Sequence, residues 1–205
     1  MDLPDAGRLT PRSPWLARRT LLRAAVAACV ASAARQANAH EVIGVVKPAQ
    51  AVPALEMTSI DGRPTRLDTL LRGKVTALQL MFTGCSATCP ISGALFSDLQ
   101  SRLAQAPSNF QLLSVSIDPL GDDPKALRAW LQRFGARPER WTAALSTTKD
   151  LDRLLDFVGG RASGVDRHTA QVYLFDTQAR LSYRTTEMPP PVAVSALMGQ
   201  IAARV

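Results

Sequence analysis

Two cysteines, Cys85 and Cys89, are the residues of this sequence whose type and spacing are best suited to chemistry. They lie in a C-x-x-x-C-P segment in which Pro90 directly follows the second cysteine. Two thiolates at this spacing can converge on one soft metal ion or close a small disulfide loop. Proline disfavours a helical conformation in the preceding residue and is favoured as the first residue of a helix. We therefore predict a helix that begins at Pro90, with Cys89 as its N-cap and Cys85 in the loop before it, where the helix N-terminus favours the thiolate form.

A histidine completes the candidate site. Two thiolates alone make an incomplete site for Cu(II), for which an imidazole is the expected further ligand. His168 lies directly before the apolar segment Gln171–Phe175, and the only other histidine outside the first 39 residues is His40. The residue types alone leave open a purely structural disulfide and an ordinary surface histidine. We interpret three methionines as core or surface residues rather than ligands, namely Met57, Met81 and Met188.

Hydrophobic periodicity divides the rest of the chain into strands and helices. The dense apolar run from Val75 to Phe82 is typical of a strand buried on both faces. Alternation over Leu55–Ser59, followed by Asp61-Gly62, predicts a β-hairpin. Apolar residues at spacings of three and four predict a helix over Ile91–Leu103 that buries both of these residues together with Leu95, Phe96 and Leu99. We expect further strands at 110–117, 141–145, 171–175 and 181–184, and further helices at 122–135, 147–157 and 191–203.

The order of these elements predicts the fold class. Strands that alternate with helices and end in a hairpin indicate an α/β domain with a mixed central sheet, an N-terminal β-hairpin and flanking helices, which is the thioredoxin-like layout. In such a fold, the turn between a buried strand and a helix is a common place for redox and metal chemistry. We therefore expect Cys85, Cys89 and His168 to meet. Residues 40–54 show no clear periodicity, so we predict a lead-in segment before a single domain over 55–205.

The first 39 residues are typical of a cleavable export signal. Arg18-Arg19 precede an apolar, alanine-rich stretch from Ala24 to Ala34, and Ala37-Asn38-Ala39 resembles a signal-peptidase site. The paired arginines favour the twin-arginine type. The apolar stretch is shorter than the roughly 20 residues that span a membrane. We expect a periplasmic protein, anchored to the membrane instead if Cys29 is lipidated, in an oxidising compartment where close cysteines can pair.

The net charge does not indicate a nucleic-acid partner. The chain carries a formal charge of +7, of which residues 1–39 supply +4 through six arginines and two acids. The remaining residues hold 18 basic and 15 acidic side chains without a dense basic cluster. Nucleic-acid binding needs such a cluster, so we exclude it.

From about Leu55 to Val205, the sequence resembles the Sco/SenC family. The segments that carry the resemblance are Gly73-Lys74, Phe82–Pro90, Ser116-Ile117-Asp118-Pro119 and His168–Asp176. The resemblance implies a thioredoxin-like fold and one copper ion, Cu(I) or Cu(II), held by two cysteines and one histidine. Cys85, Cys89 and His168 match those ligands one by one. It also implies a copper chaperone rather than an enzyme.

The resemblance further implies partners. These are a copper-donor protein and the membrane-bound subunit of cytochrome c oxidase that carries the Cu-A site, to which a monomeric chaperone delivers copper or whose thiols it keeps reduced. In the second role Cys85 and Cys89 are a redox pair, so a metal-independent periplasmic thiol–disulfide oxidoreductase is the alternative function. A peroxiredoxin-like peroxidase is disfavoured because the Pro-x-x-x-Thr-x-x-Cys pattern is missing.

Two departures from the family pattern concern the site. Ser86-Ala87 stand where family members often carry Pro-Asp after the first cysteine. Arg167 stands where an aspartate commonly precedes the histidine, and Asp166 lies one residue earlier. A carboxylate beside the histidine orients the imidazole as a hydrogen-bond partner. These departures bear on copper affinity and partner choice more than on the fold. We predict that Asp118 serves as a turn residue.

Overall fold

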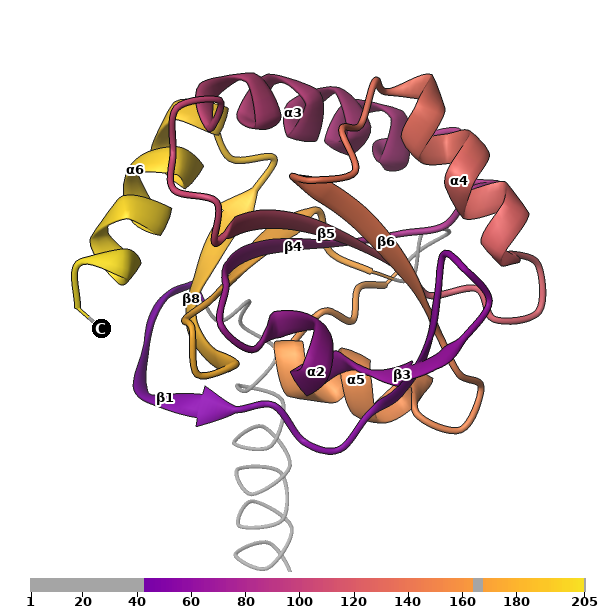
Figure 1. Ribbon diagram of the computed structural model, residues 1–205. Helices are drawn as coiled ribbons and strands as arrows, with labels where there is room; N and C mark the ends of the chain where they lie inside the picture. Colours follow the sequence, from indigo (N-terminus) through magenta and orange to yellow (C-terminus); the bar gives the residue numbers. More distant parts are fainter. Residues whose placement is uncertain (1–42, 164–167, 205) are drawn as a thin grey trace, which may run out of the picture. The chain divides into compact units, whose positions relative to one another are not determined.

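The computed structural model describes residues 43–163 and 168–204, and they form one mixed sheet with helices on both faces (Figure 1). The predicted export signal, Cys29 and His40 lie outside the described residues, and so do Asp166 and Arg167. The strands are β1 (Gly44–Ala51), β2 (Glu56–Ser59), β3 (Pro64–Arg66), β4 (Val75–Met81), β5 (Phe110–Ser116), β6 (Trp141–Ser146), β7 (Gln171–Phe175) and β8 (Arg180–Glu187). The helices are α2 (Leu67–Leu71), α3 (Thr88–Arg102), α4 (Pro124–Arg133), α5 (Leu151–Val158) and α6 (Pro191–Ala202).

The strand order explains why segments that are distant in the sequence meet at one end of the central strands. Among the described residues the order is β1-β8-β7-β4-β5-β6-β2-β3. β4 runs parallel to β5 and antiparallel to β7. The end of β4 therefore lies beside the start of β7, where Gln79 pairs with Val172. In an antiparallel pair, the end of one strand lies beside the start of the other. The segment after β4 and the segment before β7 are therefore neighbours.

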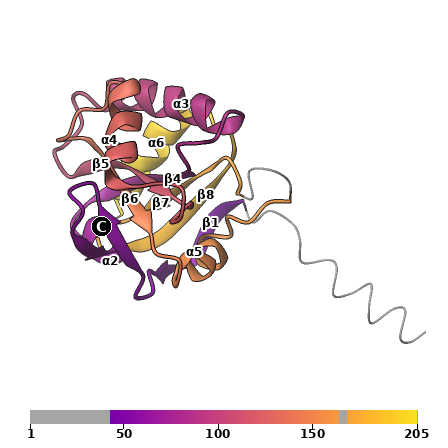
Figure 2. The ribbon, with the colours of Figure 1, turned by 90° about the vertical axis from the view of Figure 1, so that its right-hand side faces the viewer.

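Two apolar layers cover the sheet. Alternate residues of β4 point to opposite faces, and all seven are buried, as predicted for a central strand. One layer packs α3, α4 and α6 against the sheet and the other packs α2 and α5 (Figures 1 and 2). Figure 2 shows the two groups of helices on opposite sides of the sheet. The predicted α/β, thioredoxin-like class with a mixed sheet is confirmed.

The N-terminal hairpin is confirmed, and the segment before it differs from the prediction. β2 and β3 pair antiparallel, with Met57 opposite Thr65. Residues 44–51 are not a lead-in segment without structure: they form β1, an edge strand that pairs antiparallel with β8. Only Val46 of this strand is buried, so no hydrophobic alternation marks it in the sequence, and its pairing with β8 shifts between Val45 and Gln50. Pro48 has no N–H to donate to a neighbouring strand, so an edge strand is where a sheet tolerates it.

Helix α3 begins at Thr88, two residues before the predicted start, and its buried face matches the prediction in part. Phe96, Leu99 and Leu103 are buried, whereas Ile91 is 59% exposed. The buried face continues toward the helix start through Cys89, Ser92 and Gly93 instead. Small polar residues occupy this face in the first turns, and a hydrophobicity pattern therefore does not reveal it. Among the described residues, no helix is both long and apolar enough to cross a membrane.

Candidate metal centre

The cysteine turn joins β4 to α3. The chain turns where the N–H of Cys85 donates to the carbonyl of Phe82 (3.2 Å). Helix α3 begins at Thr88, with Ala87 as its N-cap and no side chain capping it. The N–H of Cys89 donates to the Sγ of Cys85 (3.3 Å). The sulfur of Cys85 thus takes the place at the helix N-terminus that a capping oxygen usually fills.

The prediction that Cys89 is the N-cap was wrong. Cys89 is the second residue of α3 and Pro90 the third. The first N–H groups of a helix have no partner within the helix, so proline removes no hydrogen bond at the third position. The helix can therefore begin two residues before the proline. The consequence is that Cys89 faces the core, with 1% of its surface exposed, while Cys85 stays partly exposed in the turn.

His168 lies beside Cys89, as predicted. The Nε2 atom of His168 is 3.9 Å from the Sγ of Cys89, although 79 residues separate them in the chain. His168 is 5% exposed. A β-bridge to Arg161 and a hydrogen bond from the N–H of Thr169 to the carbonyl of Gly160 (2.9 Å) hold the backbone just before β7.

Neighbouring groups fix the orientation of the imidazole. Its Nδ1 is 2.9 Å from the carbonyl of Thr169. A carbonyl can only accept, so Nδ1 carries a hydrogen, and in a neutral imidazole the unprotonated nitrogen is then Nε2, the atom nearest to the sulfur of Cys89. The ring of Phe82 meets the imidazole edge-on, with 6.1 Å between centroids. The hydroxyl of Tyr173 is 2.6 Å from the Thr169 hydroxyl and secures that residue.

The role expected of an acidic neighbour is thus filled by a backbone carbonyl. Sequence reasoning looked for a side chain that orients His168 and did not find Thr169, Phe82 or Tyr173. Every residue carries a carbonyl, so the sequence contains no signal for this contact. The two aromatic residues carry only the general signal of core positions in their strands.

Cys85, the third predicted copper ligand, lies in the turn before α3. Its Sγ lies 3.9 Å from the hydroxyl of Thr88. Within residues 43–163 and 168–204, no three His, Cys, Asp or Glu side chains stand close enough together to hold a metal ion as they are. The structure therefore brings Cys89 and His168 together and places Cys85 on the adjacent turn. Thiolate sulfur and imidazole nitrogen are a donor set that suits copper, so the residue types fit the predicted ion.

A buried aspartate that sequence reasoning missed supports the turn from the other side. The carboxylate of Asp122 accepts hydrogen bonds from the N–H of Thr83 (3.1 Å) and from the hydroxyl of Ser116 (2.5 Å), and it also contacts the hydroxyl of Thr83. Asp118 accepts from the N–H of Gly121 (2.9 Å), which matches its predicted role as a turn residue. The loop after β5 therefore braces the loop after β4.

Comparison with known proteins supplies an independent line of evidence. The SCO1/SenC family model matches residues 47–199. A SCO1 protein homologue of Bacillus subtilis is 31% identical over 81 residues, which are 40% of this chain and 42% of that protein. A proposed copper-binding protein of Stutzerimonas stutzeri is 29% identical over 126 residues, which are 58% of this chain and 60% of that protein. Each match thus spans less than two thirds of the relative's own length.

The fold has solved counterparts as well. The crystal structure of a SCO1/SenC family lipoprotein from Bacillus anthracis superimposes with a TM-score of 0.63. It is 25% identical in sequence, and the match covers 76% of this chain and 96% of that one.

Proposed function

This chain belongs to the SCO1/SenC family, and from that premise we propose that it binds one copper ion through Cys85, Cys89 and His168. The observation that carries the proposal is the 3.9 Å approach of His168 Nε2 to Cys89 Sγ. Nδ1 donates to the Thr169 carbonyl, which leaves Nε2 of a neutral imidazole available as the ligand atom. The buried thiol of Cys89 and the oriented imidazole of His168 would be two of the copper ligands, and a third is needed. The copper-binding role proposed for the Stutzerimonas relative agrees with this assignment.

Cys85 supplies the third ligand by turning its sulfur from the helix N-terminus toward the other two. Its partial exposure makes it the ligand that an incoming ion meets first. Both cysteines bind as thiolates, so copper uptake releases their protons. Two thiolates hold Cu(I), and the imidazole adds most to the affinity for Cu(II).

The ion is cargo rather than a resident cofactor. We propose that the protein is an exported copper chaperone that receives copper from a donor protein and delivers it to the Cu-A site of cytochrome c oxidase. Export is supported by the signal-like residues 1–39 and by the related Bacillus anthracis lipoprotein. We further propose that the protein works as a monomer in the periplasm, close to the membrane, and that lipidation of Cys29 would anchor it there.

Thiol–disulfide exchange is the second candidate function, and the turn geometry favours it. Cys85 is partly exposed, and the N–H of Cys89 donates to its sulfur at the start of α3, so this sulfur is open to a partner disulfide while Cys89 lies four residues away. The Cys85 thiolate would attack a partner disulfide and release one partner thiolate. Cys89 would then attack the mixed disulfide, which leaves a Cys85–Cys89 disulfide and a fully reduced partner. This reaction needs no copper and no His168.

Copper titration of the reduced protein tests the proposal. Wild type is compared with His168→Ala and with the double variant Cys85→Ser/Cys89→Ser, for Cu(I) and for Cu(II). We expect one tight site in the wild type, with a thiolate-to-copper charge-transfer band for Cu(II). The double variant should lose tight binding of both ions. The histidine variant should lose mainly Cu(II) affinity, because two thiolates still hold Cu(I).

Absence of tight copper binding would favour the thiol–disulfide oxidoreductase function. If the wild type binds neither ion tightly but still cycles its cysteine pair with a disulfide substrate, the copper proposal fails and the oxidoreductase function replaces it. His168→Ala separates the two again, since it should leave a metal-free exchange rate unchanged.

A further inference from the structure

Met188 has a backbone conformation that is unusual for its residue type. It follows β8 with φ of +45°, in the left-handed region that bulky residues rarely adopt. Such strain persists only where surrounding contacts hold it, and it often marks a functional position. The N–H of Met188 donates to the carbonyl of Ala170 (3.1 Å), two residues beyond His168. This bond holds Met188 against the segment that carries the histidine.

The side chain of Met188 reaches the helix that carries Cys89. Its Sδ lies 3.9 Å from the hydroxyl of Ser92. Ser92 comes three residues after Cys89 in α3, so the two residues share one face of the helix, one turn apart. Both residues are buried on that face. Met188 thus contacts both segments that supply proposed ligands: its backbone binds the segment after His168, and its thioether contacts α3 one turn after Cys89.

Met188 also differs from the other methionines that the structure describes. Three of them, Met57, Met81 and Met198, are buried in the core. Met188 is half-buried and directly follows the end of β8. A core methionine fills space, but an accessible thioether beside thiolate and imidazole donors can bind a soft ion. Sequence reasoning gave Met188 no ligand role because no motif connects it to the cysteines.

We propose that the thioether of Met188 is an additional, Cu(I)-selective ligand of this site, an inference that rests on the proposed copper-binding function. Soft sulfur ligands favour Cu(I), so Met188 should raise the affinity for Cu(I) and leave that for Cu(II) almost unchanged. It would thereby retain the reduced ion while the other three ligands serve both oxidation states.

The test compares Met188→Leu with Met57→Leu in the otherwise intact protein. Both changes replace a thioether by a side chain of similar volume, and Met57 lies in β2 within the opposite core layer. Met188→Leu should weaken Cu(I) binding by roughly tenfold, on the order of the loss seen when an interaction that supports a metal site is removed. With Cu(II) affinity unchanged, that loss lowers the Cu(II)/Cu(I) potential by about 59 mV. Met57→Leu should change neither value.

A spectroscopic readout accompanies the affinities. With ¹³C-methyl methionine labelling, the methyl resonance of Met188 should shift with one equivalent of Cu(I), while that of Met57 stays in place. Met188→Gly is the second variant, since glycine adopts the left-handed backbone freely and still removes the sulfur. It should fold and show the same loss of Cu(I) affinity.

Each outcome has one meaning. If wild type binds copper tightly, but both Met188 variants match its Cu(I) affinity and the Met188 methyl does not shift, the ligand role of Met188 is wrong and the three-ligand proposal stands. If wild type binds no copper, the proposed function fails and the role of Met188 fails with it.

Discussion

The cysteine turn depends on one buried carboxylate. Asp122 accepts from the N–H of Thr83 and from the hydroxyl of Ser116, and so joins the loop after β4 to the loop after β5. Thr83 precedes Cys85 by two residues. Removal of a buried acceptor leaves its donors unsatisfied, which costs more than the net value of the hydrogen bonds. At the scale of single residues, Asp122 therefore supports the cysteine turn through the backbone of Thr83.

Replacing Asp122 should loosen the turn. We expect Asp122→Ala to lower the free energy of unfolding by about 1–3 kcal/mol, because buried donors lose their acceptor. Amide hydrogen exchange at Thr83 should accelerate in the same variant. Urea unfolding and exchange measured by NMR check the two expectations.

The neighbouring aspartate is the matched control. Asp123 is the N-cap of α4 and accepts from the N–H of Ala126 (2.7 Å). Its replacement by alanine should cost about 1 kcal/mol through loss of the cap and should leave exchange at Thr83 unchanged. Equal effects of the two variants on Thr83 would mean that the brace assigned to Asp122 is wrong.

The ring of Phe134 packs closely on the first turns of α3, the helix that carries Cys89. A methyl group at Gly93 would lie 2.5 Å from the Cζ atom of Phe134, which follows α4. The ring of Phe134 packs on that of Trp130, with 4.9 Å between centroids. Gly93 comes one helical turn after Cys89, so its lack of a side chain makes room for the Phe134 ring beside the start of α3.

Two glycine-to-alanine changes should have opposite signs. Gly93→Ala should destabilise the protein by about 1–3 kcal/mol, the usual cost of overpacking a filled contact. Gly199→Ala, in α6, should stabilise it by about 0.4–1 kcal/mol, because a methyl group there meets nothing within 4 Å. Thermal unfolding of both variants checks the expectation. Stabilisation by both would show that the Phe134 ring moves aside and sets no limit on α3.

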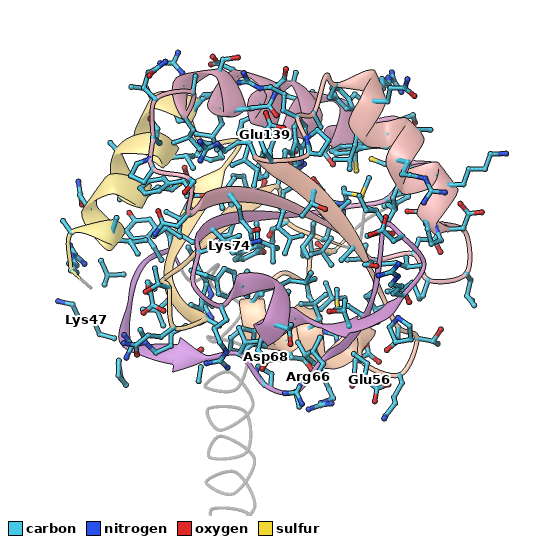
Figure 3. The ribbon with its side chains drawn as sticks, viewed as in Figure 1. Lys47, Glu56, Arg66, Asp68, Lys74 and Glu139 are labelled. Carbon is cyan, nitrogen blue, oxygen red and sulfur yellow. The ribbon has the colours of Figure 1, made fainter. Side chains whose placement is uncertain are left out.

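At the scale of the whole molecule, exposed ion pairs contribute little, whereas the buried carboxylate of Asp150 connects two elements. Arg66 and Asp68 pair at 2.9 Å where β3 meets α2, and the Glu56 side chain pairs with Lys149 at 3.5 Å (Figure 3). Exposed pairs of this kind contribute about 0–1 kcal/mol. Asp150, which is buried, accepts from the backbone N–H of Glu56 (2.7 Å) and from Arg153 (2.6 Å), and so joins the start of β2 to the start of α5.

This contact predicts a loss of stability in acid. The N–H of Glu56 and, after it, the Arg153 guanidinium hold the pKa of Asp150 below its ordinary value of 3.8, despite an opposing effect of burial. A carboxyl group with a lowered pKa in the folded state stabilises the fold above its unfolded pKa, and this contribution disappears as the pH falls through the folded pKa. We expect the free energy of unfolding to decrease below about pH 5, and less steeply in Asp150→Asn.

The control for this pH dependence is an exposed carboxylate. Glu139→Gln, at the position labelled in Figure 3, should leave the acid limb as steep as in the wild type. At neutral pH, Asp150→Asn should be less stable than the wild type by about 1–3 kcal/mol, since a charge-assisted buried contact is weakened. Urea unfolding from pH 3 to 7 measures the free energy of unfolding of both proteins. If it falls equally steeply with decreasing pH in wild type and in Asp150→Asn, the role assigned to Asp150 is wrong.

Local patterns were enough to predict the central elements and the cysteine motif. The apolar run that became β4, the hairpin of β2 and β3, and the aspartate and proline that open α4 all act through neighbours in the chain. Hydrophobic alternation and capping are short-range effects, so a sequence carries them directly. The exact start of α3 was wrong because proline is compatible with several of the first positions of a helix.

Contacts between distant segments were decided by the tertiary structure. His168 meets Cys89 because β7 lies antiparallel beside β4, and the imidazole turns its Nε2 inward because a backbone carbonyl accepts from Nδ1. Met188 contacts Ser92 of α3 and Asp122 accepts from the N–H of Thr83, and no spacing in the sequence indicates either contact. The sequence by itself determined the donor atoms and the turn that carries two of them. Which other groups surround those donors depends on strand order and loop packing, which arise from the burial of both faces of the sheet at once and leave no local pattern in the chain.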